Sequence, residues 1–517
     1  MNKKSAGGPA AVIEIGSSAV RMRVSQLRRG EIETLDALEY PVYLGHEVFN
    51  EGRVSFESLR QLSSILSKFT SALADYGCKN VRVVSSTVMR EAENRSFVAD
   101  QIKIHNNLNL EILEYSTEKA LICSEIIRIL KQQSKQPDMQ NMVIAYIGTG
   151  SIGIALYDGS AISVSQNIPI GSLKLHDTLS TLNQESNAFY PVIEEYLDIV
   201  FNRVDISSSE IHSIVLTGSD LALVASVCDA EYNGDIYTIP AKKLRAAYNE
   251  VRSMSYSAVA RRYNISEDRA EILYTALSIY NGMLRLSKDQ AKILCPDIDI
   301  CDAITRHMLI PGAEKDYEAQ TRTSALVSAR RIASKYNCHG IHSAAVSAFA
   351  TELFDKMKKV HGLSEDKKLI LELAAILHSC GQYINVRTHT QCSFDLIKNF
   401  DIFGLTSDQI LLTAFVSGYN EFAVPNASDY RYLRLSEEKR IEIAKLVAIF
   451  RIANALDKSK RQKLKPTKIK ITKDKLEIKV DTTGNALLEK WAFEECAGFF
   501  KEVFGLSPEL HIRSNLL

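Results

Sequence analysis

Two short turns rich in glycine and hydroxyl-bearing residues are the parts of the sequence best suited to chemistry. Gly16-Ser17-Ser18 and Gly148-Thr149-Gly150-Ser151 each follow an apolar run. Glycine lets the backbone approach a phosphate closely, and the N–H groups and hydroxyls of such a turn can bind an anion. Either turn alone is ordinarily a plain hairpin turn, but two related copies could hold a phosphate chain from both sides of a cleft.

The two turns belong to a weak internal repeat. Residues 11–24 and 142–157 both consist of an apolar run, a small-residue turn and a second run of strand-like residues. This pattern predicts a β-hairpin in each copy, and hence two copies of one β-rich unit.

Helices and further strands must position these turns. Residues 55–76 have a helical period, 81–84 read as a short buried strand, 110–113 as another strand, and 116–131 as a helix. The alternation predicts a mixed sheet covered by helices, and the polar stretch 132–138 reads as a linker. After residues 215–218 the chain is predicted to be helical to about Leu309, where Pro311-Gly312 breaks the pattern.

The length of 517 residues exceeds what one hydrophobic core can organise, so several domains are expected. We place them at 1–138 and 139–312, two α/β domains; 313–460, an all-α domain; and 461–517, a small α+β domain. In the last one, alternating runs around Lys473-Asp474 predict a hairpin over 468–480, followed by a helix over 485–504 and a strand over 509–513.

Composition indicates where in the cell the protein is expected and which classes of partner are not. The 62 Lys and Arg residues balance 62 Asp and Glu residues, which argues against a polycation built to bind nucleic acid. The nine cysteines are scattered and contain no Cys-x-x-Cys pair, as in reduced cytoplasmic proteins. No apolar run is long enough to predict a signal peptide or a membrane span. We therefore expect a cytoplasmic protein with neither nucleic acid nor membrane as partner.

Five segments together resemble a known family. Residues 11–24, 83–94, 111–122, 142–156 and 266–270 are similar to the successive motifs of the exopolyphosphatase/guanosine-pentaphosphate phosphohydrolase (Ppx/GppA) family, and the resemblance covers nearly the whole chain. It implies that the first two domains have the fold shared by actin and hexokinase, that the third is a helical HD-like domain, and that a small fourth domain closes the chain. It also implies a homodimer.

The resemblance assigns roles to individual residues. It implies that Glu118 is the general base for the attacking water, that Arg90, in the loop after the strand 81–84, binds phosphate, and that Gly218-Ser219 belongs to a further phosphate loop. The residues alone allow Ser116 to cap the helix, which places Glu118 in the first turn, where the helix dipole favours an ionised carboxylate. Without the resemblance, Glu118 reads as a capping residue and Arg90 as a surface arginine.

The sequence also departs from the family pattern. Glu14 stands where the family normally has Asp, Tyr146 replaces a second Asp and Gly153 replaces a Glu; these acids resemble magnesium ligands of the family. A hard divalent cation needs charged oxygen ligands. We expect Mg²⁺, or Mn²⁺, to arrive with the substrate phosphates and to use Glu14 or Glu118 as its protein anchor.

The third domain also keeps only part of a ligand pattern. HD-type hydrolases hold a metal through His residues and a His-Asp pair. The corresponding places here are His342, His378-Ser379, His389 and Asn420. Ser379 lacks the charge of the usual Asp, so a helical scaffold is expected in place of a metal centre.

A basic run follows the third domain. Its cations are Lys458, Lys460, Arg461, Lys463 and Lys465. Such a run is ordinarily a solvated face; the alternative is a track that guides polyphosphate, which would make binding depend on salt.

Taken together, the sequence favours a phosphoanhydride hydrolase of the exopolyphosphatase type, which releases terminal phosphate from inorganic polyphosphate. Hydrolysis of guanosine pentaphosphate is a closely related option; the chain length and the basic C-terminal run favour polyphosphate. The alternative is a protein that binds polyphosphate, guanosine pentaphosphate or guanosine tetraphosphate as a sensor, without turnover. Tyr146 and Gly153 favour this alternative. A sugar or acetate kinase of the same fold fits less well, because the resemblance extends into C-terminal domains that those kinases lack.

Overall fold

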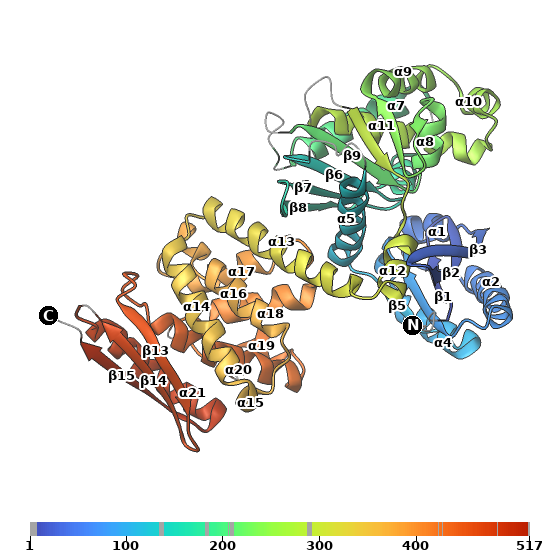
Figure 1. Cartoon of the computed structure of the whole chain (residues 1–517). Coiled ribbons are helices and arrows are strands. Elements are labelled where there is room, and N and C mark those ends of the chain that lie inside the picture. The colour runs from blue at the N-terminus through green and yellow to red at the C-terminus, as the bar shows by residue number, and fades with distance from the viewer. Residues whose placement is uncertain are drawn as a thin grey trace. The chain divides into compact units, whose positions relative to one another are not determined.

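The computed structural model describes residues 8–133, 139–180, 186–204, 206, 211–286, 292–421, 423–426, 428–482 and 484–514. The chain forms two compact units, Met1–Ser324 and Ala325–Leu517, which are described in turn (Figure 1).

The first unit begins with a five-stranded sheet. The strands are β1 (Ala10–Ile15), β2 (Ala19–Arg28), β3 (Glu31–Pro41), β4 (Asn80–Ser85) and β5 (Leu110–Ile112), in the order β3-β2-β1-β4-β5. Strands β1, β2 and β3 are antiparallel, whereas β4 pairs in parallel with β1 and β5. Every residue of β1 is buried, because the strand lies in the middle of the sheet. The hairpin predicted over residues 11–24 is confirmed.

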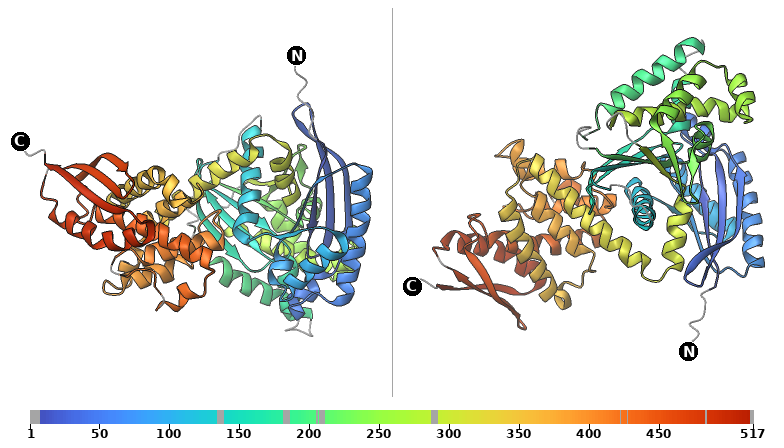
Figure 2. Two further views of the ribbon diagram at one scale, coloured as in Figure 1. Left: turned by 90° about the horizontal axis from the view of Figure 1, so that it is seen from below. Right: turned by 45° about the horizontal axis from the view of Figure 1, so that its top comes forward.

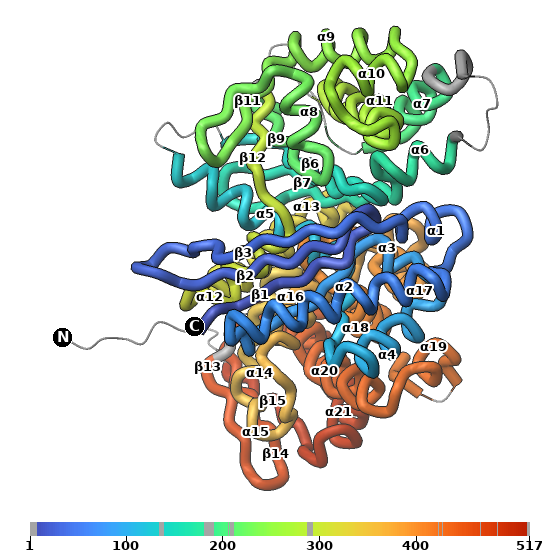
Figure 3. Tube along the Cα trace, turned by 90° about the vertical axis from the view of Figure 1, so that its right-hand side faces the viewer, coloured from blue at the N-terminus to red at the C-terminus, as the bar shows by residue number. Residues whose placement is uncertain are grey.

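Helices cover this sheet and carry the site residues. They are α1 (Leu44–Glu51), α2 (Phe56–Asp75), α3 (Thr87–Glu91), α4 (Arg95–Asn106) and α5 (Tyr115–Gln132). The side chain of Ser55 caps α2 by accepting from the Ser58 N–H, as is typical of a serine N-cap. Helix α2 buries Leu62, Leu66 and Phe69, and α2 and α4 lie side by side (Figure 3).

A seven-stranded sheet follows in the same unit. Its strands are β6 (Met142–Ile147), β7 (Ile152–Tyr157), β8 (Ile162–Ile168), β9 (Ser213–Gly218), β10 (Glu231–Tyr232), β11 (Ile236–Pro240) and β12 (Lys292–Pro296), in the order β10-β11-β12-β9-β6-β7-β8. The prediction of helices alone from residue 219 to about 309 is therefore wrong. Strands β10 to β12 were missed because they are short, and their sheet pairing with β9 is not visible in local sequence.

The helices of this second lobe are α6 (Ser172–Ser180), α7 (Ser186–Phe201), α8 (Leu221–Val227), α9 (Ala241–Arg252), α10 (Tyr256–Tyr263), α11 (Glu267–Met283) and α12 (Ile300–Leu309), with a 3-10 turn at Leu284–Leu286. Helix α12 packs against β1 of the first sheet. The segment between β12 and α12 therefore leads the chain back from the seven-stranded sheet to the five-stranded one.

The strand orders show that the two lobes repeat one topology. The order β3-β2-β1-β4-β5 of the first sheet recurs in the second as β8-β7-β6-β9-β12. In both, the first three strands in sequence form an antiparallel meander, and two further strands add in parallel: β4 and β5 in the first sheet, and β9 and β12 in the second. The internal repeat predicted from the two glycine turns is confirmed.

Helix α5 connects the lobes. It follows β5 of the first sheet and packs against β6 and β7 of the second, and Figure 2 shows it in cyan between the two sheets. It begins at Tyr115, and its N-cap, Glu114, makes no side-chain capping bond. The prediction that Ser116 is the N-cap is therefore wrong, but Glu118 still lies in the first turn.

The second unit is mainly helical. Helix α13 (Ala313–Lys335) runs into it, and α14 (Gly340–Lys356), α15 (Lys358–His361), α16 (Lys367–Leu377), a 3-10 turn (Cys380–Tyr383), α17 (His389–Ile397), α18 (Ser407–Gly418), α19 (Tyr430–Leu433) and α20 (Glu437–Ala455) follow. The chain ends in β13 (Leu464–Ile471), β14 (Lys475–Thr482), α21 (Leu487–Phe504) and β15 (Ser507–Ser514), with strand order β13-β14-β15. One continuous apolar core joins the helices to this small sheet through residues such as Ile449, Leu476 and Phe500. The predicted division into four domains stays a prediction.

Within the described parts of the chain, no helix has both the length and the apolar character needed to cross a bilayer.

Candidate active site

The glutamate and the arginine singled out in the sequence form an ion pair. Nη1 of Arg90 donates to Oε2 of Glu118 over 2.8 Å, and both side chains are largely buried. Arg90 lies in the short helix α3, so its prediction as a loop residue is wrong. Residues 28 positions apart in the chain thus meet because β4 and β5 are parallel neighbours and the helices after them start at the same sheet edge.

Further contacts fix the Arg90 guanidinium in place. Nη1 also donates to the Leu113 carbonyl (2.6 Å), Nη2 donates to Thr87 Oγ1 (2.7 Å), and the group lies over the Tyr115 ring at 3.8 Å. Its Nε is buried without an acceptor. The guanidinium is therefore held beside Glu118, with Nε as a donor that has no partner.

The first glycine turn is tightly constrained by its own backbone. Gly16 N–H donates to the Ala19 carbonyl, and the Ser17 carbonyl accepts from Gly45 N–H at the start of α1. A Cβ on Gly45 would come within 2.8 Å of the Ser17 Cβ and 2.6 Å of Leu173. The turn is thus packed against α1, and through Gly45 against the start of α6.

The second glycine turn lies against the first lobe. Ser151 Oγ and Thr87 Oγ1 are 3.1 Å apart, and a Cβ on Gly150 would come within 2.5 Å of Thr87 and 2.7 Å of Phe49. The Thr149 carbonyl accepts from the Leu173 and Lys174 N–H groups at the start of α6. The structure therefore brings this turn to Thr87, which also contacts Arg90.

The predicted pair Gly218-Ser219 ends β9 next to the second turn. Gly218 has φ +149, and a Cβ there would come within 1.9 Å of the Ile147 carbonyl oxygen. Ser219 N–H donates to that same oxygen over 3.1 Å. Glycine is required here because β6 and β9 approach too closely for any side chain.

A cavity of about 600 Å³ opens between the two lobes. Among the predicted residues only Ser18 and Ser219 line it; Arg90 and Glu118 do not. Residues that the sequence analysis missed also line it, namely Arg21, His46, Asp220 and Arg269. The available signal for Arg21 and Arg269 was their position in the segments 11–24 and 266–270, which resemble family motifs; nothing local marked His46.

Several polar contacts hold the lobes together beside this cavity. His46 on α1 lies 2.8 Å from Asp177 on α6, and this carboxylate raises the pKa of His46. Lys174 of α6 contacts Glu91 of α3 at 2.6 Å. Since both pairs join the five-stranded lobe to α6, they favour the closed arrangement of the lobes.

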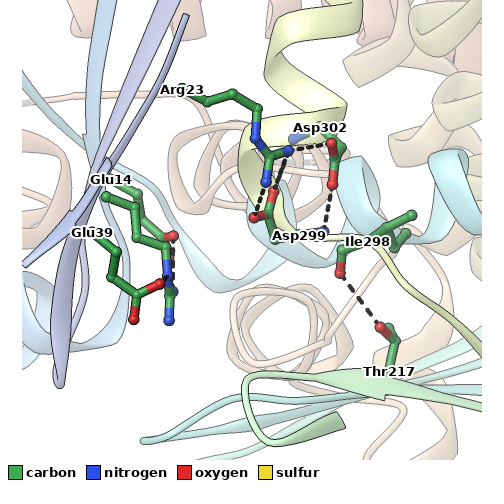
Figure 4. A network of polar contacts seen from close by, with 8 residues as sticks. Glu14, Arg23, Glu39, Thr217, Ile298, Asp299 and Asp302 are labelled. Carbon is green, nitrogen blue, oxygen red and sulfur yellow. Dashed lines mark hydrogen bonds and ion pairs between the residues drawn. The ribbon is translucent and has the colours of Figure 1, made fainter. Parts of the chain in front are cut away.

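Glu14 is buried at the end of β1. Oε2 accepts from Nη1 of Arg21 over 3.4 Å, and Arg21 also contacts Glu39 (Figure 4). Burial raises the pKa of Glu14 to about 7, although Arg21 acts in the opposite direction. Near neutral pH, Glu14 therefore carries only part of the charge that a cation would need.

The two departures from the family pattern have structural consequences. Burial, with the charges of Glu118 and Glu14, raises the pKa of Tyr146 well above its ordinary value, so the phenol stays neutral between two carboxyl groups. A Cβ on Gly153 would come within 3.2 Å of Cδ of Lys119, a buried residue of α5. Gly153 thus leaves room for the Lys119 side chain.

The donor set of the chain alone does not fit a divalent metal ion. Within the described residues, no group of three or more His, Cys, Asp and Glu side chains is arranged to hold one. Glu118 is engaged by Arg90, Glu14 by Arg21, and the neutral phenol of Tyr146 is a poor ligand. Any Mg²⁺ would depend on oxygen ligands from the substrate.

A second polar cluster fixes the segment that returns to the first lobe (Figure 4). Arg23 of β2 contacts Asp299, the N-cap of α12, at 2.9 Å, and it also contacts Asp302 of the same capping box. Thr217 Oγ1 donates to the Pro296 carbonyl over 2.8 Å and to that of Ile298 over 3.5 Å. Residues of both sheets therefore bind the short segment between β12 and α12.

The residues predicted from the HD pattern lie in the second unit. Nδ1 of His342 is 2.8 Å from Oδ2 of Asp457, the His342 and His378 rings are 5.3 Å apart, and Asn420 donates to the His378 carbonyl. The sequence analysis missed Asp457, which lies just before the basic run. Burial lowers the pKa of His378 to about 3, so this ring stays neutral.

The neighbouring residues of that pattern make structural contacts. Ser379 is buried, and His389 lies 3.3 Å from Glu421. Gln462 donates to Asp457 from its backbone N–H (2.7 Å) and its side chain (2.9 Å). Hydrogen bonds thus account for Asp457 without a metal ion.

The basic run is partly neutralised. Lys458 contacts Glu421 at 3.0 Å, and Lys463 contacts Glu489 at 3.7 Å. Arg461 and Lys465 are exposed, and Lys460 has a left-handed backbone with φ 57. Only three of the five cations are therefore without a carboxylate partner among the residues that the structure describes.

Comparisons with known proteins agree with this arrangement. The model of the Ppx/GppA phosphatase family matches residues 23–297, and the model of Ppx/GppA phosphatase domain III matches residues 326–495. Guanosine-5'-triphosphate,3'-diphosphate pyrophosphatases of Vibrio parahaemolyticus and Vibrio atlanticus are 18% identical over 485 residues and 20% identical over 412 residues. The first alignment covers 91% of both chains, and the second covers 77% of this chain and 78% of its relative.

An exopolyphosphatase from Cytophaga hutchinsonii has a similar fold. Its crystal structure matches with a TM-score of 0.51 and 16% identity over 58% of this chain and 97% of that one. The two family models together span most of the sequence, including the second glycine turn, Arg90 and Glu118, whereas the first glycine turn lies before residue 23, where the match begins. The chain therefore belongs to the Ppx/GppA phosphatase family, whose members hydrolyse phosphoanhydrides.

Proposed function

We propose that the protein removes the terminal phosphate from guanosine pentaphosphate or inorganic polyphosphate, with Glu118 as the general base. The observation that carries this proposal is the 2.8 Å contact between Arg90 and Glu118 at the meeting point of the two lobes. A base and a cation held side by side can act on a water molecule and on the phosphoryl group that it attacks.

The ion pair supports each role. The Glu118 carboxylate would accept a proton from water, and its contact with Arg90 fixes its position. Arg90 in turn would stabilise negative charge on the transferring phosphoryl group. Phosphoryl transfer depends mainly on positioning and charge stabilisation. The turns at Gly16 and Gly148 would supply backbone N–H groups that position the phosphate.

A divalent cation would enter with the substrate. The phosphate oxygens would have to supply most of the ligands to Mg²⁺ or Mn²⁺, and Glu14 or Glu118 would be the protein group that holds the ion. The cation would add charge neutralisation at the phosphate chain. Because the pKa of Glu14 is raised to about 7, the carboxyl group loses its proton as the pH rises through this value, and its affinity for a cation would increase.

Two substrates share the same chemistry. The curated relatives aligned over most of the chain are named for the guanosine compound, and the Cytophaga structure is named an exopolyphosphatase. Ser18, Ser219 and Arg269 around the interlobe cavity offer hydroxyl and guanidinium contacts to a phosphate chain from either source.

A second candidate is binding without turnover. Tyr146 and Gly153 support it, because neither can hold the cation that the family acids would hold, and the surrounding carboxylates are already paired with arginines. Such a protein would close on a phosphate chain and report its presence as a sensor.

Two measurements distinguish the hydrolase from the sensor. The first is phosphate release from both substrates with and without Mg²⁺ or Mn²⁺, and the second is calorimetry of substrate binding. Under the first proposal, Glu118→Gln lowers release at least about 100-fold but leaves binding nearly unchanged. Glu111→Gln is the matched control, since Glu111 is an exposed partner of Arg82 on β5. Binding without release in the wild type would instead establish the sensor.

A further inference from the structure

The second unit contains a cavity that the proposed function does not use. It lies between α20 and α21, closed on one side by the chain after α18, and has a volume of about 320 Å³. Small-molecule sites begin at about this size. Within the second unit it is lined by buried polar groups at one end and by aromatic side chains at the other.

Arg451 of α20 supplies an uncompensated positive charge. The residue is only 5% exposed, and Nη1 donates to the Ala423 carbonyl over 2.8 Å. Nε is buried without an acceptor, and among the described residues no carboxylate lies within ion-pair distance of the guanidinium. A buried cation without a counter-ion is unfavourable, so this end of the cavity favours an anionic group.

The adjacent asparagines add a second unmet polar group. Oδ1 of Asn420 is buried without a donor, and Asn454 donates to the Asn420 backbone carbonyl over 3.3 Å. Both residues line the cavity with Arg451. A buried acceptor next to a buried, unneutralised donor is expected where a polar ligand completes the hydrogen bonds.

Glu421, an acid that lines the cavity, is paired with other residues and not with Arg451. Glu421 is held by Lys458 at 3.0 Å and by His389 at 3.3 Å. The hydrogen bond from His389, with the contact from Lys458, lowers the pKa of Glu421 to about 2 although burial acts against them. Glu421 therefore stays ionised, and its charge is already balanced by Lys458.

The outer wall of the cavity suits a flat ring. Trp491 and Phe499 of α21 line it, and Trp491 is 46% exposed. A partly exposed indole offers its face for stacking. Glu495 and Glu502, which are exposed, also line this wall and would repel a long polyanion such as polyphosphate.

We propose that this cavity binds a small molecule that carries one carboxylate or phosphate group and a planar ring. Arg451 binds the anionic oxygens, and Trp491 packs against the ring. The shared chemistry fits two sources, a nucleoside monophosphate and an aromatic carboxylic acid. The inference concerns residues of the second unit only and does not depend on turnover at Glu118.

The single tryptophan of the chain makes the test direct. Trp491 fluorescence and calorimetry of the full-length protein are measured with four probes: GMP, 4-hydroxybenzoate, inorganic phosphate and tripolyphosphate. We expect at least one ring-bearing probe to change the fluorescence and to bind at least about 10-fold more tightly than the two ring-free anions. GMP and 4-hydroxybenzoate distinguish the two sources, and binding of either one supports the site.

Variants connect the binding to the cavity. Arg451→Met should weaken it at least about 30-fold, because a desolvated charge pair is lost. Arg451→Lys should be intermediate, since it keeps the charge but not the planar fork. Lys501→Met is the control, because it removes an exposed cation of α21 outside the cavity.

Three results would overturn the proposal. They are equal affinity of Arg451→Met and wild type, no binding of either ring-bearing probe at millimolar concentration, or equal affinity for the ring-free anions. The melting temperature adds an independent reading: removing an uncompensated buried cation should not lower it, whereas a purely structural arginine would. If Arg451→Met does not fold, Arg451→Lys carries the same comparison.

Discussion

At the residue scale, the site is defined by which charges are already paired. Glu118 is held by Arg90 and Glu14 by Arg21, and a neutral Tyr146 lies near both carboxyl groups. In a buried site each of these pairs limits what else a carboxylate can bind.

Burial of Glu14 should make stability depend on pH. Its pKa is raised to about 7, so the native state binds a proton more tightly than the unfolded chain does, and this contribution is lost as the pH rises from about 4.5 through 7. In urea unfolding, the free energy of unfolding of the wild type should fall between pH 5 and pH 8 by up to about 3 kcal/mol more than that of Glu14→Gln.

Asp302, whose pKa is also raised to about 7 by burial, is present in both proteins and cancels in this difference. Glu33→Gln, at an exposed ion pair on β3, is the control and should run parallel to wild type. Equal pH dependence of Glu14→Gln and wild type would show that Glu14 titrates normally.

Restoring an acid at position 146 should create a cation site. In Tyr146→Asp a third carboxylate joins Glu14 and Glu118, and their mutual repulsion favours a divalent cation. Adding Mg²⁺ at about 100 times its dissociation constant would stabilise the variant by about 2.7 kcal/mol. Thermal unfolding should then shift upward by several degrees.

Tyr146→Phe serves as the comparison for that experiment, since it removes the hydroxyl without adding charge. It should show the same Mg²⁺ response as wild type. If Mg²⁺ shifts Tyr146→Asp no more than Tyr146→Phe, the missing acid is not what limits metal binding.

At the element scale, the close approach of β6 and β9 is the feature that places Ser219 at the cavity. Gly218→Ala should destabilise the protein by about 3 kcal/mol or more, because its Cβ would overlap the Ile147 carbonyl. Chemical denaturation measures the loss. Gly234→Ala has a comparable positive φ of +106 with open space around it, and should cost only about 1–2 kcal/mol. Equal losses in the two variants would mean that backbone strain alone explains the effect.

Helix α5 is the element that unites the two lobes at the site. It carries Glu118 in its first turn, beside Arg90 of α3, and its buried Lys119 packs over Gly153 of β7. Glu118, the proposed base, is therefore positioned by both sheets, although α5 follows the last strand of the first sheet.

At the scale of the whole molecule, the chain consists of two compact units with separate cores. Differential scanning calorimetry should therefore resolve two unfolding transitions. Gly218→Ala should lower one of them, and Phe450→Ala, which opens a cavity in the core of the second unit, should lower the other by the equivalent of about 3–5 kcal/mol. A single transition that both variants shift together would show that the units unfold as one.

The sequence by itself determined the features that depend on local pattern. Alternation of apolar residues around Gly16 and Gly148 predicted both hairpins, and the helical period after Ser55 predicted α2 to within a residue. The family followed from the same motifs, because they are short stretches whose chemistry is set by adjacent residues. The first residue of α5 was predicted less exactly. Ser116 fits the rule for an N-cap, but the N-cap is Glu114 and the helix begins at Tyr115.

Only the tertiary structure decided which distant residues meet. Strands β10 to β12 depend on pairing with a sheet begun far earlier in the chain, so no local period revealed them. The contact of Arg90 with Glu118, the partner of His342 at Asp457, and the unpaired charge of Arg451 are set by packing between elements. Burial likewise turned Glu14 from an ordinary acid into one with a pKa of about 7. These properties arise from desolvation and long-range contacts, which a linear sequence does not display.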